Sequence, residues 1–334
     1  MSSAQTILSQ AHSLSHAEAP EDAEGKDDCM RSVTVDAFAK INLTLRVLGK
    51  RPDGFHDVRT VLQTIDLCDR IVYVSRRGPL RLRCFAEGVP DDHTNLVWRA
   101  AAALWRAAGR SGEPRDLEIV VTKRIPARAG LGGGSCDAAA TLMALSRLWN
   151  LDLSRQVLAQ VAATLGSDVP FFLWGGAALG LGRGDEIYPL ADLPRWWAMI
   201  VTPPFGILTP EAYDWSDTGT VGEGLVPDSR LTGTWLGRLP TLGNDLEASA
   251  ARLHPEIAQT VAALRQQGAL LAAMSGSGSA IFGLFAGRRA ADAARRQLRV
   301  AASWRAQIVR LLPRDDFVRR TRPVLAARRG SRIN

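Results

Sequence analysis

The sequence lacks the features that define several large classes of protein. No apolar run approaches the roughly 20 residues that a membrane-spanning helix needs. The N-terminus has no basic-then-apolar segment of the kind that marks a secretory signal. The four cysteines are scattered without a C-x-x-C pair, so their spacing predicts neither a zinc site nor a disulfide framework. These absences favour a cytoplasmic protein whose thiols stay reduced.

Three familiar nucleotide-binding signatures are also missing. There is no G-x-x-x-x-G-K-[ST] motif, which excludes a Walker A phosphate loop. No G-x-G-x-x-G is followed by an acidic residue about 20 positions later, so a Rossmann site is not indicated. The loop, H-R-D and D-F-G set of protein kinases is absent as well. A nucleotide site in this chain must therefore be of another kind.

What is present is the composition of an ordinary globular protein. The 334 residues, of which 46% are apolar and 22% charged, are enough for one large or two ordinary domains. Strand-like and helix-like segments are mixed without a regular βαβ alternation, and no internal repeat is visible. This mixture favours an α+β fold over a doubly wound sheet.

The net charge of +7 is spread unevenly along the chain. Residues 1–29 are acidic and poor in large apolar side chains, so a disordered N-terminal extension is expected, and Met30 is an alternative start. Residues 314–334 hold seven arginines and two aspartates, which predicts a solvated basic tail rather than a nucleic-acid contact. The remaining basic excess suits a protein that holds polyphosphates. We expect neither nucleic acid nor membrane as a partner.

Periodicity and turn signals predict two folded domains, residues 30–190 and 191–313. In the first, we expect two strands within 32–49 joined near Ala39–Lys40, a strand at 116–126, and helices at 95–108, 138–149 and 154–165. In the second, we expect a strand at 196–204, an irregular insertion at 216–240, two helices divided near His254-Pro255, a strand–turn–strand at 269–287, a helix at 288–300 and a last strand. Asn95 is a predicted helix N-cap, and Asn244-Asp245 is predicted to be a cap without a chemical role.

The most informative stretch is "PARAGLGGGSCDAAA", Pro126–Ala140, in which four glycines fall between Gly130 and Gly134. Successive glycines can turn their N–H groups toward one point, because a positive φ costs glycine little. A helix that follows adds the positive end of its dipole. The stretch therefore predicts a phosphate-binding loop, and a flexible turn between helix and sheet is the alternative. Ser135 can donate to a phosphate oxygen, bind a magnesium ion or cap the helix.

This stretch resembles the second motif of the GHMP small-molecule kinases. The blocks "AFAKINLTLRVLGKRPDGFHDVRTV" and "GSDVPFF" are similar to one branch of that family, and "GNDLE" and "MSGSGSAIFGLF" fit its C-terminal half. That branch uses ATP to phosphorylate the 2-hydroxyl on the methylerythritol part of a cytidine diphosphate substrate, in non-mevalonate isoprenoid synthesis. The resemblance covers Val33–Gly287 in five ordered blocks. It implies an N-terminal domain like ribosomal protein S5 domain 2, a ferredoxin-like C-terminal domain and an active site between them.

The resemblance implies catalytic roles for Lys40 and Asp168. A carboxylate near the reacting alcohol can take its proton, and Pro170 stiffens the loop that carries Asp168. The Lys40 ammonium can keep Asp168 ionised and favour the developing alkoxide. Lys40 lies within an apolar strand pattern, which favours a paired lysine over a solvated one. A turn or N-cap aspartate is the alternative for Asp168.

The resemblance also implies two sets of binding residues. The ATP-binding set comprises Lys123, Pro126, Ala127, Arg128, Ala129, Gly130, Leu131, Gly132, Gly133, Gly134, Ser135 and Cys136. The substrate-binding set comprises Asn42, Phe55, His56, Tyr213, Ser275 and Gly276. An aromatic ring at Phe55 can stack on cytosine while His56 bonds its edge, with Tyr213 as the opposite wall. The Ser275–Ser279 turn is expected near the phosphates, or is a plain hairpin. Arg128 and Cys136 depart from the family pattern.

The expected ligands are ATP, Mg²⁺ and the cytidine diphosphate sugar alcohol. No acidic metal ligand stands out, so the ion is expected to bind ATP oxygens and Ser135. The chain is expected to be a monomer or a homodimer. Two alternatives remain open at this point: another GHMP kinase that acts on mevalonate or homoserine, and a catalytically silent relative that binds nucleotide as a sensor.

Overall fold

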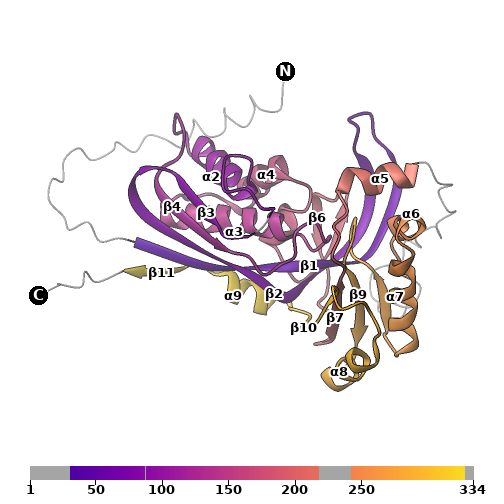
Figure 1. Ribbon diagram of the computed structural model, residues 1–334. Helices are drawn as coiled ribbons and strands as arrows, with labels where there is room; N and C mark the ends of the chain where they lie inside the picture. Colours follow the sequence, from indigo (N-terminus) through magenta and orange to yellow (C-terminus); the bar gives the residue numbers. More distant parts are fainter. Residues whose placement is uncertain (1–30, 87, 218–241, 328–334) are drawn as a thin grey trace, which may run out of the picture.

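The described residues form two β-sheets, one in each of two lobes (Figure 1). The computed structural model describes residues 31–86, 88–217 and 242–327. Two long strands, β1 (Arg31–Lys50) and β2 (His56–Pro79), extend from the larger lobe toward the smaller one. The two lobes are therefore connected by the strands of one hairpin.

The larger sheet has seven strands. Five follow the order β11-β1-β2-β4-β3, and β5 pairs with both β2 and β6. Its further members are β3 (Arg81–Cys84), β4 (Arg115–Thr122), β5 (Ala177–Leu181), β6 (Glu186–Pro189) and β11 (Val324–Ala327). One face is covered by α2 (Leu96–Ala107), α3 (Gly133–Leu148), α4 (Arg155–Leu165) and the 3₁₀ turn η2 (Pro170–Leu173), and the other by α9 (Arg314–Thr321) (Figure 1). The main apolar core lies between this sheet and α2, α3 and α4.

The smaller sheet has four antiparallel strands in the order β10-β7-β9-β8. They are β7 (Trp197–Thr202), β8 (Leu271–Met274), β9 (Ile281–Phe285) and β10 (Arg305–Arg310). The lobe also contains α5 (Thr209–Asp217), α6 (Asp245–Leu253), α7 (Pro255–Gln266) and α8 (Arg288–Gln297). A strand, helices, two strands, a helix and a last strand follow one another, which is the ferredoxin-like arrangement. The α+β, two-domain prediction is confirmed.

The first strand departs from its prediction as two strands joined near Ala39–Lys40. β1 is one strand, and its register with β2 shifts between Phe38 and Lys40. At this bulge the Lys40 backbone N–H donates to the Leu131 carbonyl at 3.0 Å. Every residue from Ala37 to Leu45 is buried, because this part of the strand is covered on both faces. The expected break is therefore a β-bulge that joins the strand to the glycine loop.

The helix after the glycine loop begins earlier than predicted. α3 starts at Gly133 rather than Ala138, and Gly132 is its N-cap with φ 71°. A Cβ at Gly132 would lie 2.8 Å from Phe172 Cζ and 3.1 Å from Lys40 Cγ, so glycine allows this close approach. Ser135 consequently lies in the first turn and does not cap the helix. The predicted caps Asn95 of α2 and Asn244 of α6 are confirmed by side-chain hydrogen bonds to backbone N–H groups.

The prediction of a basic tail at residues 314–334 is wrong for its first part. α9 packs under the larger sheet, where the Phe317 ring lies 6.2 Å from the Phe38 ring, and β11 pairs with β1. The prediction followed the many arginines of the segment and did not take account of Phe317, which is buried. The predicted extension at 1–29, residues 218–240 of the predicted insertion and residues 328–334 lie outside the described residues. None of the helices that are described is long and apolar enough to cross a membrane.

Candidate active site

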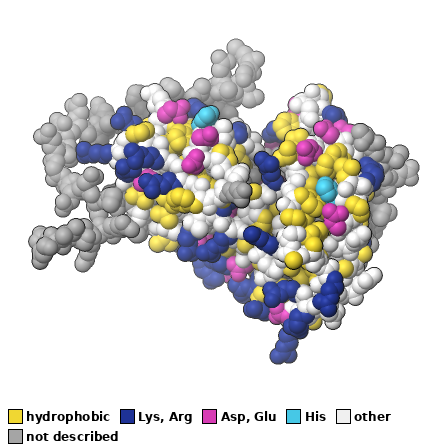
Figure 2. All heavy atoms as spheres, viewed as in Figure 1, with side chains coloured by type: hydrophobic (Ala, Val, Ile, Leu, Met, Phe, Trp, Pro, Cys, Tyr) yellow, Lys and Arg dark blue, Asp and Glu magenta, His cyan; other side chains and the backbone are white. Residues whose placement is uncertain are grey.

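A cavity of about 640 Å³ lies between the two lobes, and the space-filling view shows the surface hollowed there (Figure 2). β1 contributes Lys40 and Asn42, and the loop after β4 contributes Ile125 to Gly132. The smaller lobe contributes the chain around α5 together with Gly276 and Ser277. The cavity therefore collects most of the residues that the sequence singled out.

Lys40 and Asp168 meet at the wall of this cavity. The Lys40 Nζ atom lies 3.3 Å from Asp168 Oδ2, and the exposed fraction is 3% for the lysine side chain and 36% for the aspartate. Lys40 Nζ also donates to Asn42 Oδ1, and Asn42 Nδ2 donates to Thr60 Oγ1 at 2.7 Å. These bonds fix the ammonium, while the carboxylate remains open to the cavity. A ligand hydroxyl can reach this carboxylate without displacing the lysine.

The glycine loop is bonded to the turn between β8 and β9 of the smaller lobe. The Ser275 Oγ–H donates to the Gly130 carbonyl at 3.0 Å, and the Ala280 N–H donates to the Ala129 carbonyl at 3.1 Å. Gly130 has φ 70°, and a Cβ there would lie 2.0 Å from the Ser275 carbonyl oxygen. Only a glycine allows the loop of the larger lobe to touch the turn of the smaller lobe this closely.

The start of α3 forms one wall of the cavity. The N–H groups of Gly133, Gly134 and Ser135 belong to the first turn, which has no intrahelical acceptors for them. Together with the helix dipole they form a site suited to an anion. Of the predicted ATP-binding residues, Lys123 and all residues from Pro126 to Ser135 line the cavity. Arg128 is exposed at its mouth with φ 53°.

Cys136, which was also predicted to bind ATP, does not line the cavity. Its side chain is buried, and Sγ–H donates to the Gly133 carbonyl at 3.0 Å and faces the Ala37 carbonyl of β1. Its position on the helix turns it toward the sheet. Burial, followed by the neighbouring Asp137 charge, raises the pKa of this thiol. The sequence alone could not show this, because the helix phase depends on where α3 begins.

Ser275, predicted to bind substrate, is likewise absent from the cavity wall. It is fully buried, and its Oγ accepts the Asn42 N–H at 3.2 Å in addition to its bond to the loop. Its neighbour Gly276 does line the cavity, and a Cβ at this glycine would lie 3.1 Å from Lys40 Nζ. The hydroxyl therefore joins β1, the glycine loop and the turn, and the glycine lets the turn reach the lysine.

Asn244 does more than cap α6. Its Oδ1 accepts the Leu246 N–H at 3.0 Å, as predicted, and its Nδ2 donates to the carbonyls of Met274 and Gly276 at 2.9 and 2.6 Å. The same side chain thus holds the glycine turn against the helix start. The local sequence predicted only the capping role of Asn244, because the glycine turn that it also bonds lies about 30 residues further along the chain.

The other end of the cavity is aromatic. The rings of His56 and Tyr213 stack with centroids 4.6 Å apart at 18°, and His56 Nε2 lies 2.8 Å from Asp217 Oδ1. Tyr213 was expected across a bound base, whereas here it lies against the histidine itself. Burial, and then the charge of Asp168, raises the pKa of Tyr213, so the phenol stays neutral. Asp217, which the sequence did not single out, positions the imidazole.

Phe55 stands half-exposed at the same end. The Arg183 guanidinium lies 5.0 Å from the centre of its ring, and Arg183 is held by Asp185 Oδ2 at 2.5 Å. Arg183 lies on the turn between β5 and β6 and was not singled out from the sequence. The signal that could have found it is an arginine between two glycines, in "GLGRGDE".

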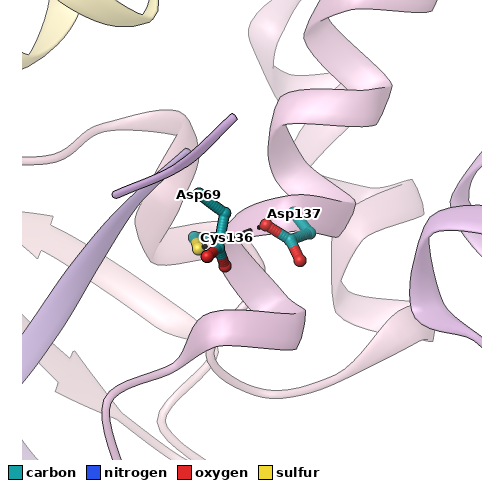
Figure 3. Close-up of side chains that lie close together, drawn as sticks. All are labelled: Asp69, Cys136 and Asp137. Atoms are coloured by element: carbon teal, nitrogen blue, oxygen red, sulfur yellow. Dashed lines mark hydrogen bonds between the residues drawn. The ribbon is translucent and has the colours of Figure 1, made fainter. Parts of the chain in front are cut away.

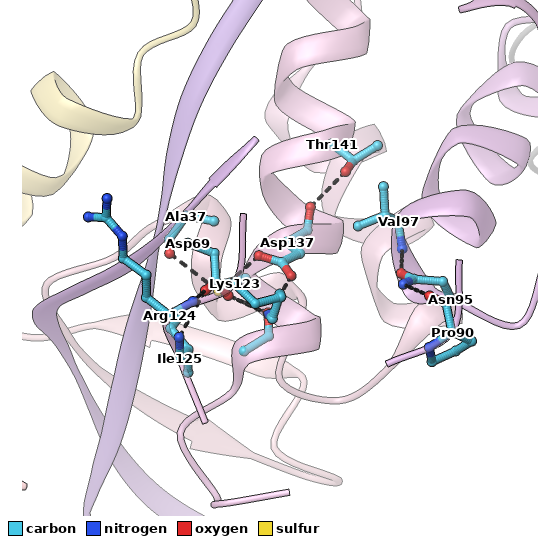
Figure 4. Close-up of polar contacts among 12 residues, drawn as sticks. Ala37, Asp69, Pro90, Asn95, Val97, Lys123, Arg124, Ile125, Asp137 and Thr141 are labelled. Atoms are coloured by element: carbon cyan, nitrogen blue, oxygen red, sulfur yellow. Dashed lines mark hydrogen bonds and ion pairs between the residues drawn. The ribbon is translucent and has the colours of Figure 1, made fainter. Parts of the chain in front are cut away.

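A buried cluster lies beneath the glycine loop. The Lys123 Nζ atom is bonded to Asp69 Oδ2 and, at 2.7 Å, to Asp137 Oδ2 (Figure 4). Burial raises the pKa of Asp137, and the positive charge of Lys123 opposes part of this rise. Burial by itself would lower the pKa of Lys123, but the charges of Asp137 and Asp69 outweigh it, so the pKa of Lys123 is raised. Asp69, Cys136 and Asp137 lie close enough to share a cation (Figure 3). The ammonium already occupies both carboxylates, so the trio does not fit a metal ion.

Two family models match the chain. Residues 95–176 match the model of the GHMP kinases N-terminal domain, and residues 229–302 match that of the GHMP kinases C-terminal domain. A 4-diphosphocytidyl-2-C-methyl-D-erythritol kinase from Moorella thermoacetica is 43% identical over 77% of this chain and 91% of its own. One from Solibacter usitatus is 45% identical over 78% of this chain and 83% of its own.

Solved structures agree with these matches. A 4-(cytidine 5'-diphospho)-2C-methyl-D-erythritol kinase is 36% identical with a TM-score of 0.65, over 83% of this chain and 98% of its own. Homoserine kinase from Cytophaga hutchinsonii is 18% identical with a TM-score of 0.62, over 92% and 100%, which supports the fold alone.

Proposed function

The chain belongs to the GHMP kinases, in the family of 4-diphosphocytidyl-2-C-methyl-D-erythritol kinases, and we propose that it has the activity of that family. It transfers the γ-phosphoryl group of ATP to the 2-hydroxyl of 4-diphosphocytidyl-2-C-methyl-D-erythritol, in non-mevalonate isoprenoid synthesis. The observation that carries this proposal is the Lys40–Asp168 pair, which shares one cavity with the glycine loop and the aromatic end.

Asp168 is the proposed base. The substrate oxygen attacks the γ-phosphorus of ATP, and the proton of the substrate hydroxyl passes to Asp168 Oδ. The bond between the γ-phosphorus and the bridging oxygen breaks, and this oxygen leaves with ADP. Lys40 lies beside this carboxylate and stabilises the negative charge on the attacking oxygen. What supports these roles is the buried ammonium fixed by Asn42 and the carboxylate that faces the cavity.

The start of α3 and its loop are the proposed phosphate site. Gly133, Gly134 and Ser135, whose N–H groups belong to the first turn of α3, line the cavity, and the Lys123 ammonium lies close to Gly133. We also propose that Mg²⁺ accompanies ATP, because the Ser135 hydroxyl offers an oxygen donor on this wall. The ion would be held by ATP oxygens and Ser135, and it neutralises phosphate charge when bound.

Phe55 and His56 are the proposed cytosine site. The exposed face of Phe55 can stack on a base, and the His56 imidazole, held by Asp217, can bond a base edge. We further propose that the partners are small molecules without nucleic acid, that the protein acts in the cytoplasm, and that it is a monomer or a homodimer. The absence of nucleic acid is supported by ion pairs that neutralise part of the basic excess, because Asp66 pairs with both Arg310 and Arg320.

The direct test is turnover by the purified chain. With Mg-ATP and 4-diphosphocytidyl-2-C-methyl-D-erythritol we expect ADP and a product heavier by one phosphoryl group, measured by mass spectrometry and ³¹P NMR. With mevalonate or homoserine we expect no product, and CDP should inhibit competitively with the cytidine substrate. Phosphorylation of mevalonate or homoserine instead would assign the chain to another branch of the GHMP kinases.

Phe55→Ala tests the cytosine site. Stacking of a base on an aromatic ring is worth about 1–3 kcal/mol, so we expect the KM for the cytidine substrate to rise on the order of 10-fold. The KM for ATP should stay unchanged in the same steady-state assays. Phe85→Ala is the matched control, because Phe85 is 76% exposed and lies away from the cavity wall. Equal KM values for the two variants would remove Phe55 from the site.

A further inference from the structure

The buried cluster of Asp69, Lys123 and Asp137 joins three parts of the larger lobe (Figure 4). Asp69 belongs to β2, Lys123 follows directly after β4, and Asp137 lies in α3. The Asp69 side chain is fully buried, that of Asp137 is 5% exposed and that of Lys123 is 8% exposed. No role in the reaction described above uses either carboxylate.

Asp69 fixes the chain as it leaves β4. Its Oδ1 accepts the backbone N–H of Arg124 and, at 2.9 Å, that of Ile125, while its Oδ2 accepts from Lys123 Nζ. One buried carboxylate therefore bonds three successive residues. These residues immediately precede Pro126, the first residue of the glycine loop. The entry to the loop is held in one position relative to the sheet.

Asp137 fixes the chain as it leaves the loop. Its Oδ2 accepts from Lys123 Nζ at 2.7 Å, which ties the beginning of α3 to the loop entry. The position of a Cβ at Gly133 would be 3.4 Å from the same Nζ atom, so the ammonium lies directly against the helix start. Lys123 thus connects both ends of the segment from Pro126 to Gly132.

The charges explain why the three side chains act together. A buried ammonium without a partner is strongly destabilised, and two buried carboxylates without a cation repel each other. With one ammonium between them, each of the three groups has a partner of opposite charge at hydrogen-bond distance. Charge-assisted bonds of this kind are among the strongest in proteins. The loop ends are therefore held by directional bonds and not by apolar packing alone.

We propose that Asp69 and Asp137 are positioning residues for ATP, acting through Lys123 to hold the two ends of the glycine loop at the spacing the triphosphate requires. The inference rests on the proposed use of ATP at this loop. If α3 moves relative to the loop entry, its N–H groups no longer point to the same place as those of the loop. Affinity for ATP then falls, while the cytosine end of the cavity is unaffected.

Asp137→Ala is the main test, because it leaves Lys123 paired with Asp69 and so creates no unpaired buried charge. A charge-assisted bond is worth about 1.5–3 kcal/mol, so the KM for ATP should rise on the order of 10-fold or more. The KM for the cytidine substrate should change less than about 2-fold. Asp137→Asn keeps an oxygen that can accept from Lys123, so this conservative variant should restore most of the ATP affinity.

Asp69→Asn is the second variant, used where Asp137→Ala fails to fold. Its oxygen can still accept the backbone N–H groups, but its NH₂ group faces the Lys123 ammonium and the tie is lost. We expect the same selective rise in the KM for ATP. Asp152→Ala, an exposed aspartate before α4, is the control and should behave as wild type.

The outcomes separate this inference from the proposed function. If the wild type turns over and Asp137→Ala keeps its KM for ATP, or if the KM rises equally for both substrates, the positioning role is wrong. If the wild type does not phosphorylate the cytidine substrate with ATP, the proposed function itself fails. Thermal unfolding midpoints with and without ATP show whether a variant is folded before its KM is interpreted.

Discussion

Asp168→Asn is expected to lower kcat about 10³-fold, because an amide of the same shape cannot take the proton of the substrate hydroxyl. The Lys40 ammonium keeps its bond to Asn42 in this variant, so the wall of the cavity should stay intact. Both KM values should therefore remain within about 3-fold of wild type. Steady-state kinetics with each substrate varied in turn measure all three parameters.

The alternative role for Asp168 is that of a turn residue before η2. A turn residue would lose stability on substitution and keep its turnover, so the unfolding midpoint should be measured on the same sample. Asp152→Asn is the matched control, since it makes the same chemical change on an exposed aspartate. Near-normal turnover by folded Asp168→Asn would remove this carboxylate as the base.

Gly130→Ala is expected to lower kcat/KM for ATP on the order of 10²-fold. The added Cβ would lie 2.0 Å from the Ser275 carbonyl oxygen and 3.0 Å from the Gly278 nitrogen, both of them backbone atoms. The glycine loop and the turn of the smaller lobe must then separate, and a displacement of about 1 Å at a reacting group can cost 10²-fold. Destabilisation of about 1–3 kcal/mol should accompany the loss.

Gly268→Ala separates the clash from the backbone strain. Gly268 has φ 84°, in the same left-handed region, but a Cβ there would meet nothing within 4 Å. We expect a loss of stability of about 1 kcal/mol from the strained φ and normal kinetics. Denaturant unfolding and steady-state kinetics of both variants make the comparison. Equal losses of kcat/KM in the two variants would show that contact between the lobes is not what Gly130 provides.

Local signals predicted the local structure well. The predicted caps Asn95 and Asn244 each bond a backbone N–H of the helix that follows, because capping depends on residues within one turn. The division between α6 and α7 at His254-Pro255 is confirmed for the same reason. Features set by distant contacts were missed.

The start of α3 and the path of the C-terminal segment show why. Gly133 and Gly134 are poor helix formers in isolation, yet both lie in the first turn of α3, where a Cβ would be 3.1 Å from Ile125 Cγ2 or 3.3 Å from Leu96 Cδ1 and would crowd these side chains. β11 pairs with β1 across almost the whole length of the chain, so no local pattern could reveal it. The segment was predicted to be a solvated tail because it is rich in arginine, although its Phe317 side chain is buried.

The residues of the candidate site likewise include some that were predicted and some that were missed. Lys40 and Asp168 are 128 positions apart, and only the resemblance to GHMP kinases brought them together before the structure placed them 3.3 Å apart. Asp69 carries no local signature, and Asp137 was not singled out within the glycine-rich stretch, because their common partner Lys123 is a sequence neighbour of neither. Cys136 was misplaced because its side-chain direction depends on the helix start.

The central claim is that the cavity aims the terminal phosphate of ATP at an alcohol held beside Lys40 and Asp168. A crystal structure with a non-hydrolysable ATP analogue and 4-diphosphocytidyl-2-C-methyl-D-erythritol tests it most directly. We expect the 2-hydroxyl oxygen within about 2.6–3.2 Å of an Asp168 carboxylate oxygen, with the phosphates at the start of α3. A triphosphate bound away from α3, or a hydroxyl on the opposite side of the cavity from Asp168, would contradict it.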